Sequence, residues 1–408
     1  MRRMNIQNER MDAINKEKIE KTICPHSDMC GGCSYQGVEY AMQLKNKEGE
    51  VRGLLEEKAL KPEVFDSIEP SPKRYSYRNK MEYSFGDLEK GGEMTLGMHR
   101  KKMFMSIATT DECQIVPEDF NTVLKATLDF CKDLGYSHYN KRSHNGLLRN
   151  LILRCGVRTN QLLVNIVTQS DDRAGERFDE KAYADFLLGL DLKMQIVGVL
   201  RTENNSVADA VIPEKIKVVY GNDYYVEELL GLKFKVSAFS FFQTNVDAVE
   251  KLYTEALNLV DSFEGKNVFD LYSGTGTISQ VLGLKAKHVL GIELVEEAVE
   301  AAKLNAKINN LTNVDFIAGD VFEVLKTVEE KPDVIVVDPP RAGIQPKALD
   351  KIISYGVNEI VYISCNPKTL VNNLYYLEYN GYKVKYLKPF DNFPFTKHTE
   401  CIALVSRE

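Results

Sequence analysis

One short stretch near the C-terminus carries a side chain that can act as a nucleophile. Cys365 follows the apolar, β-branched run Glu359 to Ile363 and precedes Asn366-Pro367, where a strand must end. A thiol at the carboxyl edge of a parallel sheet faces the crevice where such sheets bind ligands. A lone cysteine is more often a small buried core residue, so the rest of the chain must decide between these interpretations.

A second group of thiols lies near the N-terminus. Cys24, Cys30 and Cys33 fall within ten residues, and Gly31 and Gly32 allow the backbone to turn tightly between them. Three thiols at this spacing predict a metal site. A fourth ligand is needed, and the next cysteine along the chain is Cys113. The spacing leaves zinc and a four-iron, four-sulfur cluster open, with unliganded structural cysteines as the remaining alternative.

A glycine loop marks a candidate cofactor site. The loop Tyr272-Ser-Gly274-Thr-Gly276 follows a predicted strand, Asn267 to Leu271, and its glycines permit close approach of a ligand. Glu293 ends the next strand, at the distance of about 20 residues where an acidic side chain can bind both hydroxyls of a ribose. The missing third glycine favours an adenosyl cofactor without a pyrophosphate. Asp320, after the third strand, can reach an adenine amino group or cap the following helix.

The composition is that of a globular protein. The chain has 408 residues, 44% hydrophobic and 27% charged, which suggests two or three domains. No apolar run approaches the roughly 20 residues of a membrane span, and the charged N-terminus lacks a signal peptide, so we expect no membrane partner and a cytoplasmic location. The net charge of −7 disfavours a wholly basic nucleic-acid binder but leaves local basic patches open. Eight cysteines without a secretion signal favour metal binding or catalysis over disulfides, although Cys131 and Cys155 sit in apolar patterns typical of a core.

The order of predicted elements divides the chain. From about residue 234, short apolar strands alternate with helices, which indicates an α/β domain with a mostly parallel, doubly wound sheet. Its seven predicted strands, the last two without an obvious helix between them, fit the sheet of the Rossmann-like class I methyltransferases: Asn267–Leu271, His288–Glu293, Val314–Ile317, Asp333–Asp338, Glu359–Ser364, Lys383–Pro389 and Cys401–Ser406. We expect a charged arm over 1–22, a cysteine-containing α+β domain over 23–233, whose helix 40–60 packs on the catalytic domain, and the methyltransferase domain over 234–408.

Basic and aromatic residues alternate in the stretch from Arg74 to Phe85. Such a strand offers positive charge to phosphates and ring faces to bases, although an ordinary edge strand with a solvated basic face has the same pattern. Our candidates for RNA contact are Tyr77, Arg78, Lys80, Arg149 and Phe241.

The fourth predicted strand of the α/β domain ends in Asp338-Pro-Pro-Arg341. Two prolines stiffen a loop in front of the cofactor, and Asp and Arg replace the Asn and aromatic residue that would indicate methylation of an amino group. The base-flipping N-methyltransferases therefore fit less well.

Four motifs together carry a resemblance to a known family. Asp338-Pro-Pro-Arg341, Ser364-Cys-Asn-Pro367, His398-Thr-Glu400 and Phe241-Phe-Gln243-Thr-Asn245 resemble the RNA 5-methyluridine methyltransferases, and the cysteine set resembles the branch that modifies 23S ribosomal RNA. The similarity covers residues 24 to 408. It implies methyl transfer from S-adenosylmethionine to C5 of a uridine and a [4Fe-4S] cluster on Cys24, Cys30, Cys33 and Cys113. It also implies that Gln243, Tyr272, Glu293 and Asp338 bind or border S-adenosylmethionine.

The chemistry of that reaction requires these residue types. Uracil C5 is a poor nucleophile, so a thiolate, here Cys365, must first add to C6. The resemblance assigns Glu400 as the base that removes the C5 proton afterwards, whereas by sequence alone a surface charge at the start of the last strand is the simpler interpretation. Because the target base must be unstacked, we expect a flipped or unpaired uridine. The thiolate of Cys365 is expected to be favoured by nearby positive charge or polar donors.

Other functions stay open at this point. The partner RNA is expected to be 23S rRNA rather than tRNA, and the protein to be a monomer. Family members often begin with a small β-barrel RNA-binding domain; here about twenty residues precede Cys24, so the grip on RNA is expected from the middle domain. A tRNA uridine-C5 methyltransferase and a non-catalytic RNA-binding or assembly protein on the same fold remain as alternatives. An RNA 5-methylcytosine methyltransferase would carry Asp-Ala-Pro-Cys where this chain has Asp338-Pro-Pro-Arg341.

Overall fold

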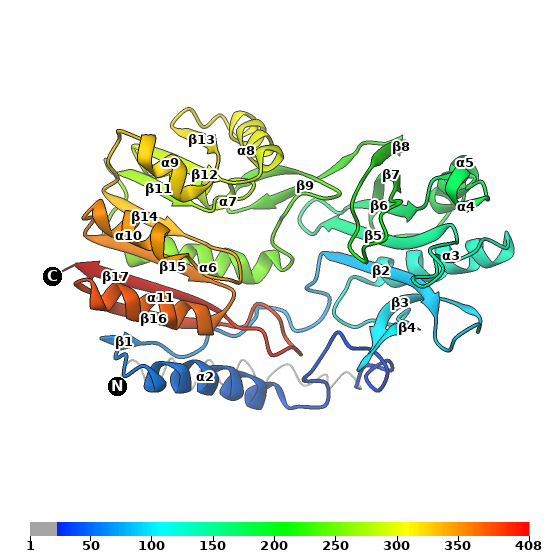
Figure 1. Ribbon diagram of the computed structural model, residues 1–408, viewed down its shortest axis with the longest axis horizontal. Coiled ribbons are helices and arrows are strands. Elements are labelled where there is room, and N and C mark those ends of the chain that lie inside the picture. The colour runs from blue at the N-terminus through cyan, green and yellow to red at the C-terminus, as the bar shows by residue number, and fades with distance from the viewer. Residues whose placement is uncertain (1–22, 408) are drawn as a thin grey trace.

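The computed structural model describes residues 23–407, so the predicted arm over 1–22 lies outside the described residues. The chain forms two lobes, each built on one large sheet (Figure 1). No helix of the described residues is long and apolar enough to cross a membrane.

The larger lobe holds an eight-stranded sheet. In spatial order its strands are β1 (Val64–Phe65), β16 (Tyr382–Phe390), β17 (Glu400–Arg407), β15 (Glu359–Ser364), β14 (Val334–Val337), β11 (Asn267–Leu271), β12 (His288–Glu293) and β13 (Val314–Ala318). All neighbouring pairs are parallel except the two that involve β17. The four residues of β14 are all buried, as expected of a parallel strand covered on both faces.

Helices cover both faces of this sheet. One face packs against α6 (Val246–Leu259), α7 (Thr277–Gly283) and α8 (Glu296–Ile308). The other face packs against α9 (Val321–Thr327), α10 (Pro346–Ser354), α11 (Pro367–Tyr379) and α2 (Tyr40–Glu57). The predicted Rossmann-like fold is therefore confirmed. All seven predicted strands are present. Strand β1 is an eighth strand, and its two residues are too few to give a recognisable sequence pattern.

Helix α2 lies far from the sheet in sequence but packs on it. Val51 and Leu55 are buried in the core that α11 and strand β16 share. Burial of two such side chains stabilises this contact by roughly 3–6 kcal/mol in all. Figure 1 shows α2 running along the outside of α11 and β16. The N-terminal part of the chain thus forms one wall of the larger lobe.

The smaller lobe holds a seven-stranded sheet. Its strands, in order, are β4 (Met103–Thr109), β3 (Met94–Arg100), β2 (Lys80–Asp87), β5 (Leu148–Gly156), β6 (Gln161–Thr168), β7 (Gln195–Glu203) and β8 (Lys215–Gly221). Three helices accompany the sheet: α3 (Glu118–Asp133), α4 (Asp171–Ala174) and α5 (Glu180–Leu188). Cys131 and Cys155 are fully buried in its core, as predicted. The predicted strand over 74–85 begins only at Lys80.

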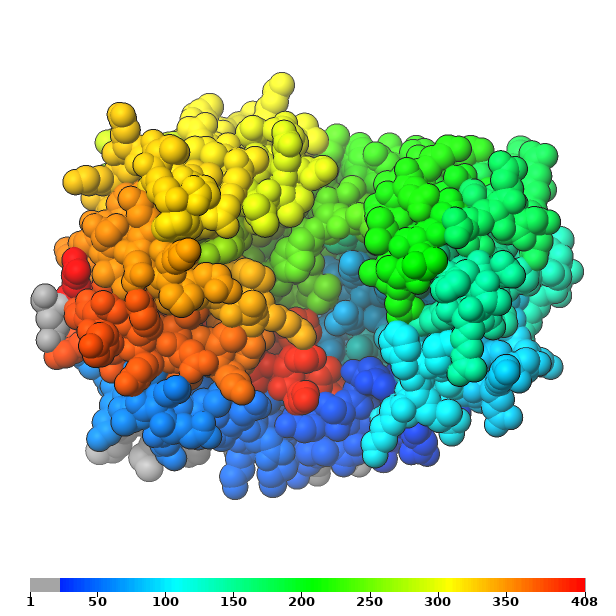
Figure 2. Space-filling model, in the orientation of Figure 1, coloured from blue at the N-terminus to red at the C-terminus, as the bar shows by residue number. Residues whose placement is uncertain are grey.

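A hairpin joins the two lobes. Strands β9 (Tyr224–Leu229) and β10 (Leu232–Ser237) pair with each other, and Tyr225 and Phe234 pack in the core of the larger lobe. The hairpin spans the position at which we expected the domains to divide. Figure 2 shows the molecular surface hollowed between the lobes, with part of the C-terminal region at the rim of the hollow.

Candidate active site

Cys365 stands in a sharp turn between strand β15 and helix α11. Asn366 caps the helix, because its side-chain oxygen accepts a hydrogen bond from the backbone N–H of Lys368 at 3.2 Å. Pro367 occupies the first helical position, where its missing N–H has no cost. The turn leaves Cys365 partly exposed at the carboxyl end of its strand.

Glu400 lies near Cys365. Strands β15 and β17 are antiparallel, and Ser364 pairs with Cys401 at the end of their ladder. Cys365 and Glu400 are the next residues of the two chains, and the Glu400 carboxyl is close enough to raise the pKa of the Cys365 thiol. Glu400 is only 9% exposed, so the alternative of a solvated surface charge does not hold.

Asp338 and Arg341 approach the same point from strand β14. Asp338 follows Val337, which pairs with Tyr362 three residues before Cys365. The loop is fastened to the turn beside the cysteine, since Asn366 Nδ2 and Thr369 Oγ1 donate to the carbonyl oxygen of Arg341 at 2.9 and 3.3 Å. The motif Asp338-Pro-Pro-Arg341 does not by itself indicate a role for Arg341, because its position near Cys365 follows only from the fold.

Three acidic groups and one cation therefore share this site. Burial raises the pKa of Asp338 to about 7. Burial and the neighbouring Asp338 raise the pKa of Glu400 to about 8, and Arg341 opposes that shift. Burial, Glu400 and Asp338 together raise the pKa of Cys365 to about 11, again against Arg341. The expectation of a favoured thiolate is wrong for the free protein, because burial and two carboxyl groups outweigh the one guanidinium.

The glycine loop lies at the carboxyl ends of the neighbouring strands β11 and β12. Tyr272 adopts a positive φ of 68°, a rare conformation for a bulky residue. Glu293 ends β12, and its carboxylate accepts hydrogen bonds from the backbone N–H groups of Gly274 and Val295, both at 3.0 Å. A carboxylate has about four acceptor positions, so Glu293 retains capacity for a ribose. Tyr272, Gly274 and Glu293 are brought together as predicted.

Two further cofactor candidates surround this loop. Gln243 Nε2 donates to the hydroxyl of the buried Tyr253 at 3.3 Å. Asp320 caps helix α9, because its side chain accepts from the backbone N–H of Glu323 at 3.2 Å. The alternative interpretation of Asp320 as a cap is therefore realised. Burial, and then the nearby carboxylate of Asp320, raise the pKa of Tyr272 to about 12. The two side chains therefore lie close to each other.

The residues predicted to contact RNA differ in how far they are exposed. Phe241 is 66% exposed beside Gly274, and its carbonyl accepts from Thr275 Oγ1 at 3.1 Å. Arg78 and Lys80 are partly exposed at the start of β2 and are linked to each other, since Arg78 Nε donates to the Lys80 carbonyl at 3.0 Å.

The prediction that Tyr77 and Arg149 contact RNA is wrong, because both side chains are buried. Tyr77 is 2% exposed, and its hydroxyl donates to the Pro394 carbonyl at 3.0 Å, so its ring offers no face to a base. Arg149 is 6% exposed and donates to the carbonyl oxygens of Asn204, Ser206 and Ala208. It holds a loop and cannot grip a phosphate in this arrangement.

The four cysteines of the predicted metal site gather at the edge of the smaller lobe. All four are free thiols. The other three thiols lie near Cys113: burial raises the pKa of Cys113 to about 12, and Cys33, Cys24 and Cys30 add to that shift. The backbone of the turn passes close to the Cys30 sulfur, since a Cβ on Gly32 would lie 3.4 Å from that atom.

The structure does not show the predicted metal site. Among residues 23–407, no group of three or more His, Cys, Asp or Glu side chains is arranged to hold a metal ion. The choice between zinc and a four-iron, four-sulfur cluster therefore stays open.

Comparison with known proteins identifies the family. The model of the tRNA (uracil-5-)-methyltransferase family matches residues 39–408. The chain belongs to this family. A Clostridium tetani protein described as an uncharacterized RNA methyltransferase is 47% identical over 96% of this chain and 85% of its own length. A similar protein of Caldanaerobacter subterraneus is 45% identical over 97% of this chain and 87% of its own length.

A solved structure of the uracil-5 methyltransferases agrees with this assignment. The crystal structure of the Pyrococcus abyssi tRNA (uracil-54, C5)-methyltransferase in complex with S-adenosyl-L-homocysteine superimposes with a TM-score of 0.75 at 26% identity, covering 92% of this chain and 86% of that one. The predicted enzyme class, an RNA (uracil-C5)-methyltransferase, is confirmed.

Proposed function

We propose that this enzyme methylates C5 of a uridine in RNA with S-adenosylmethionine as the methyl donor. The observation that carries the proposal is the proximity of Cys365 to Glu400, Asp338 and Arg341. A nucleophile and a buried base close to each other suit a reaction that adds to C6 and removes a proton from C5.

The protein groups act in a fixed order. The Cys365 thiolate forms a bond to C6, and the electron pair of the C5–C6 double bond becomes available at C5. C5 then forms a bond to the methyl group, while the bond between that methyl group and the donor sulfur would break and leave its electron pair on sulfur as S-adenosyl-L-homocysteine. Glu400 accepts the C5 proton, and the returning electron pair re-forms the double bond as the Cys365–C6 bond breaks. Atoms and electrons balance, because the thiolate is regenerated and the proton remains on Glu400.

The methyl donor fits the loop at the ends of β11 and β12. S-adenosylmethionine, when bound, supplies an electrophilic methyl group; the residues proposed to hold it are Gln243, Tyr272, Gly274, Glu293, Asp320 and Asp338. The Pyrococcus abyssi relative binds the corresponding product, S-adenosyl-L-homocysteine. Positive φ at Gly274 and Gly276 supports this role, since it lets the backbone approach a ligand.

We also propose a [4Fe-4S] cluster on Cys24, Cys30, Cys33 and Cys113. The shared neighbourhood of the four free thiols supports it. Methyl transfer moves no net electrons, so the group would fold and position the surrounding segment. The proposed division of labour gives residues 23–233 the cluster and RNA binding, and residues 234–408 the chemistry.

The proposed RNA is 23S rRNA, on the strength of the cysteine set. A specific observation favours tRNA as the second candidate: the matched family model and the Pyrococcus abyssi enzyme are both named for tRNA. The exposed ring of Phe241 and the basic Arg78 and Lys80 are the proposed RNA contacts, because they offer stacking and charge.

A single experiment tests the chemistry. RNA transcripts of both classes containing 5-fluorouridine are incubated with the protein and S-adenosylmethionine. Fluorine cannot leave as the proton does, so the reaction should stop at a covalent protein–RNA adduct that survives denaturation. The adduct should be absent in Cys365→Ala. If no transcript of either class gives an adduct, the alternative of a non-catalytic RNA-binding protein is favoured.

A further inference from the structure

Three polar side chains of helix α2 form one buried face. Tyr40, Gln43 and Lys47 are spaced by three and four residues, so they lie on the same side of the helix. Their exposed fractions are 7%, 0% and 0%. Burying a lysine and an amide is costly unless each is paired, which makes the position of their partners informative.

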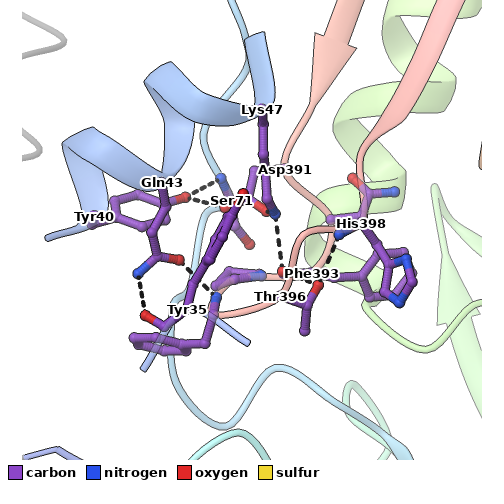
Figure 3. Close-up of polar contacts among 12 residues, drawn as sticks. Tyr35, Tyr40, Gln43, Lys47, Ser71, Asp391, Phe393, Thr396 and His398 are labelled. Carbon is purple, nitrogen blue, oxygen red and sulfur yellow. Dashed lines mark hydrogen bonds and ion pairs between the residues drawn. The ribbon is translucent and has the colours of Figure 1, made fainter. Parts of the chain in front are cut away.

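All three grip one loop, the segment between strands β16 and β17. Lys47 Nζ donates to Asp391 Oδ1 at 2.5 Å and to the Phe393 carbonyl at 3.1 Å. Tyr40 donates its hydroxyl proton to Asp391 Oδ2 at 2.8 Å. Figure 3 shows these side chains reaching from the helix toward the loop.

Gln43 holds the next turn of the same loop. Its Oε1 accepts from the backbone N–H of Phe395 at 2.9 Å, while its Nε2 donates to the Val38 carbonyl at 2.8 Å. The Phe395 carbonyl accepts from the backbone N–H of Tyr35 at 2.8 Å. Phe395 has a φ of 66°, which is unfavourable for a bulky residue and must be maintained by such contacts.

Two other parts of the chain complete the grip. Asn245 Nδ2 donates to the Asn392 carbonyl at 2.8 Å, and Tyr77 donates to the Pro394 carbonyl. Every residue from Asp391 to Phe395 is therefore tied to an element outside the loop. Five residues beyond Phe395 the chain reaches Glu400, the first residue of β17.

We propose that Tyr40, Gln43 and Lys47 are positioning residues that set the place of Glu400 for removal of the C5 proton. This inference rests on the proposed function, because it assumes that Glu400 is the base. The ion pair of Lys47 and Asp391 is fully buried, and such pairs are weak sources of stability but can specify one arrangement over others. A single defined position matters for Glu400, because a base must lie within hydrogen-bond distance of the proton that it removes from the substrate.

The proposal predicts a defect confined to one step. Cys365 is carried by β15 and α11, so its addition to C6 does not depend on the loop. Loss of the grip should leave adduct formation intact and slow removal of the proton. With ordinary uridine RNA, a covalent intermediate that wild-type enzyme resolves should then accumulate.

The test uses full-length enzyme, S-adenosylmethionine and an unmodified uridine transcript that wild-type enzyme methylates. Lys47→Met should lower kcat by about 10- to 100-fold, as expected for a misplaced catalytic group, with KM for RNA nearly unchanged. Denaturing electrophoresis should show the adduct in this variant, as in Glu400→Gln. The matched control is Lys45→Met, an exposed lysine of the same helix, which should behave as wild type.

Two more variants test the proposal if Lys47→Met does not fold. Lys47→Met with Asp391→Asn leaves no buried charge, so it should fold yet lack the tie to Phe393. Tyr40→Phe removes one hydroxyl and should give a milder form of the same defect. Thermal unfolding identifies the folded variants.

The outcomes separate the two levels of inference. Folded grip variants that resolve the adduct at the wild-type rate, beside a Glu400→Gln variant that traps it, overturn the positioning role alone. Failure of wild-type enzyme to form any Cys365-dependent adduct with 5-fluorouridine RNA overturns the proposed function itself.

Discussion

Cys365 and Glu400 are the neighbours of Ser364 and Cys401, the pair that ends one antiparallel ladder, and the Glu400 carboxyl raises the pKa of the Cys365 thiol. Strands β15 and β17 run in opposite directions, so Cys365 is the first residue after β15 and Glu400 is the first residue of β17. The proposed nucleophile and the proposed base are therefore held by two different segments of backbone. A change in either backbone can therefore affect one chemical step without the other.

Arg341 is the cation that opposes the raised pKa of Cys365. Arg341→Ala should raise that pKa further and slow adduct formation at neutral pH, since each pKa unit lowers the thiolate fraction about tenfold. The rate of adduct formation with 5-fluorouridine RNA, measured against pH, checks this. Lys347→Ala removes an exposed cation from the following helix and serves as the control. Equal rates in the two variants would refute a role for Arg341.

The pH dependence should reflect Glu400, whose pKa is raised from 4.5 to about 8 by burial and by Asp338. A base must be deprotonated, so kcat/KM should still be rising with pH near 8. Stability should change in the opposite sense. The unfolded chain releases this proton near 4.5 but the folded chain keeps it, so the free energy of unfolding falls as pH rises toward 8. Glu400→Gln should lose less stability over this interval, which thermal unfolding of both proteins would reveal.

Gly276 combines a positive φ with close neighbours. A Cβ there would lie 2.6 Å from the Phe316 ring and 2.8 Å from the Ala302 methyl group. Gly276→Ala should cost roughly 1–2 kcal/mol for the backbone and about 1–3 kcal/mol for the clash. It should also weaken binding of S-adenosyl-L-homocysteine. Gly265→Ala has the same φ of 75° with nothing within 4 Å, so it isolates the backbone cost. Equal losses of unfolding free energy would show that the clash is relieved.

The proposed cluster can be tested through Cys30. Cys30→Ser should lower the iron content and reduce folded yield or RNA affinity, while S-adenosyl-L-homocysteine binding persists in the other lobe. Iron analysis, RNA titration and calorimetry measure the three effects. Cys131→Ala removes a buried thiol of the same lobe and should keep its iron. A folded, iron-free Cys30→Ser protein that binds RNA normally would contradict the positioning role of the cluster.

The sequence predicted the parts of the site that depend on strand ends. Cys365, Asp338 and Glu293 each follow or end an apolar run, and parallel strands bring their carboxyl ends to one edge. The position of Glu400 near Cys365 could not be predicted, because the pairing of β17 is decided by tertiary contacts. Tyr77 was misjudged for the same reason: its alternating pattern suggested a surface strand, but a loop more than three hundred residues later covers it.

The grip of α2 on the loop before Glu400 also bears on how the protein is made. Tyr40 and Asp391 are 351 residues apart, so during synthesis the polar face of the helix has no native partner until the chain has been made as far as that loop. Contacts this distant in sequence form late and slow folding. We therefore expect the contacts of α2 with the loop before Glu400 to form late in folding.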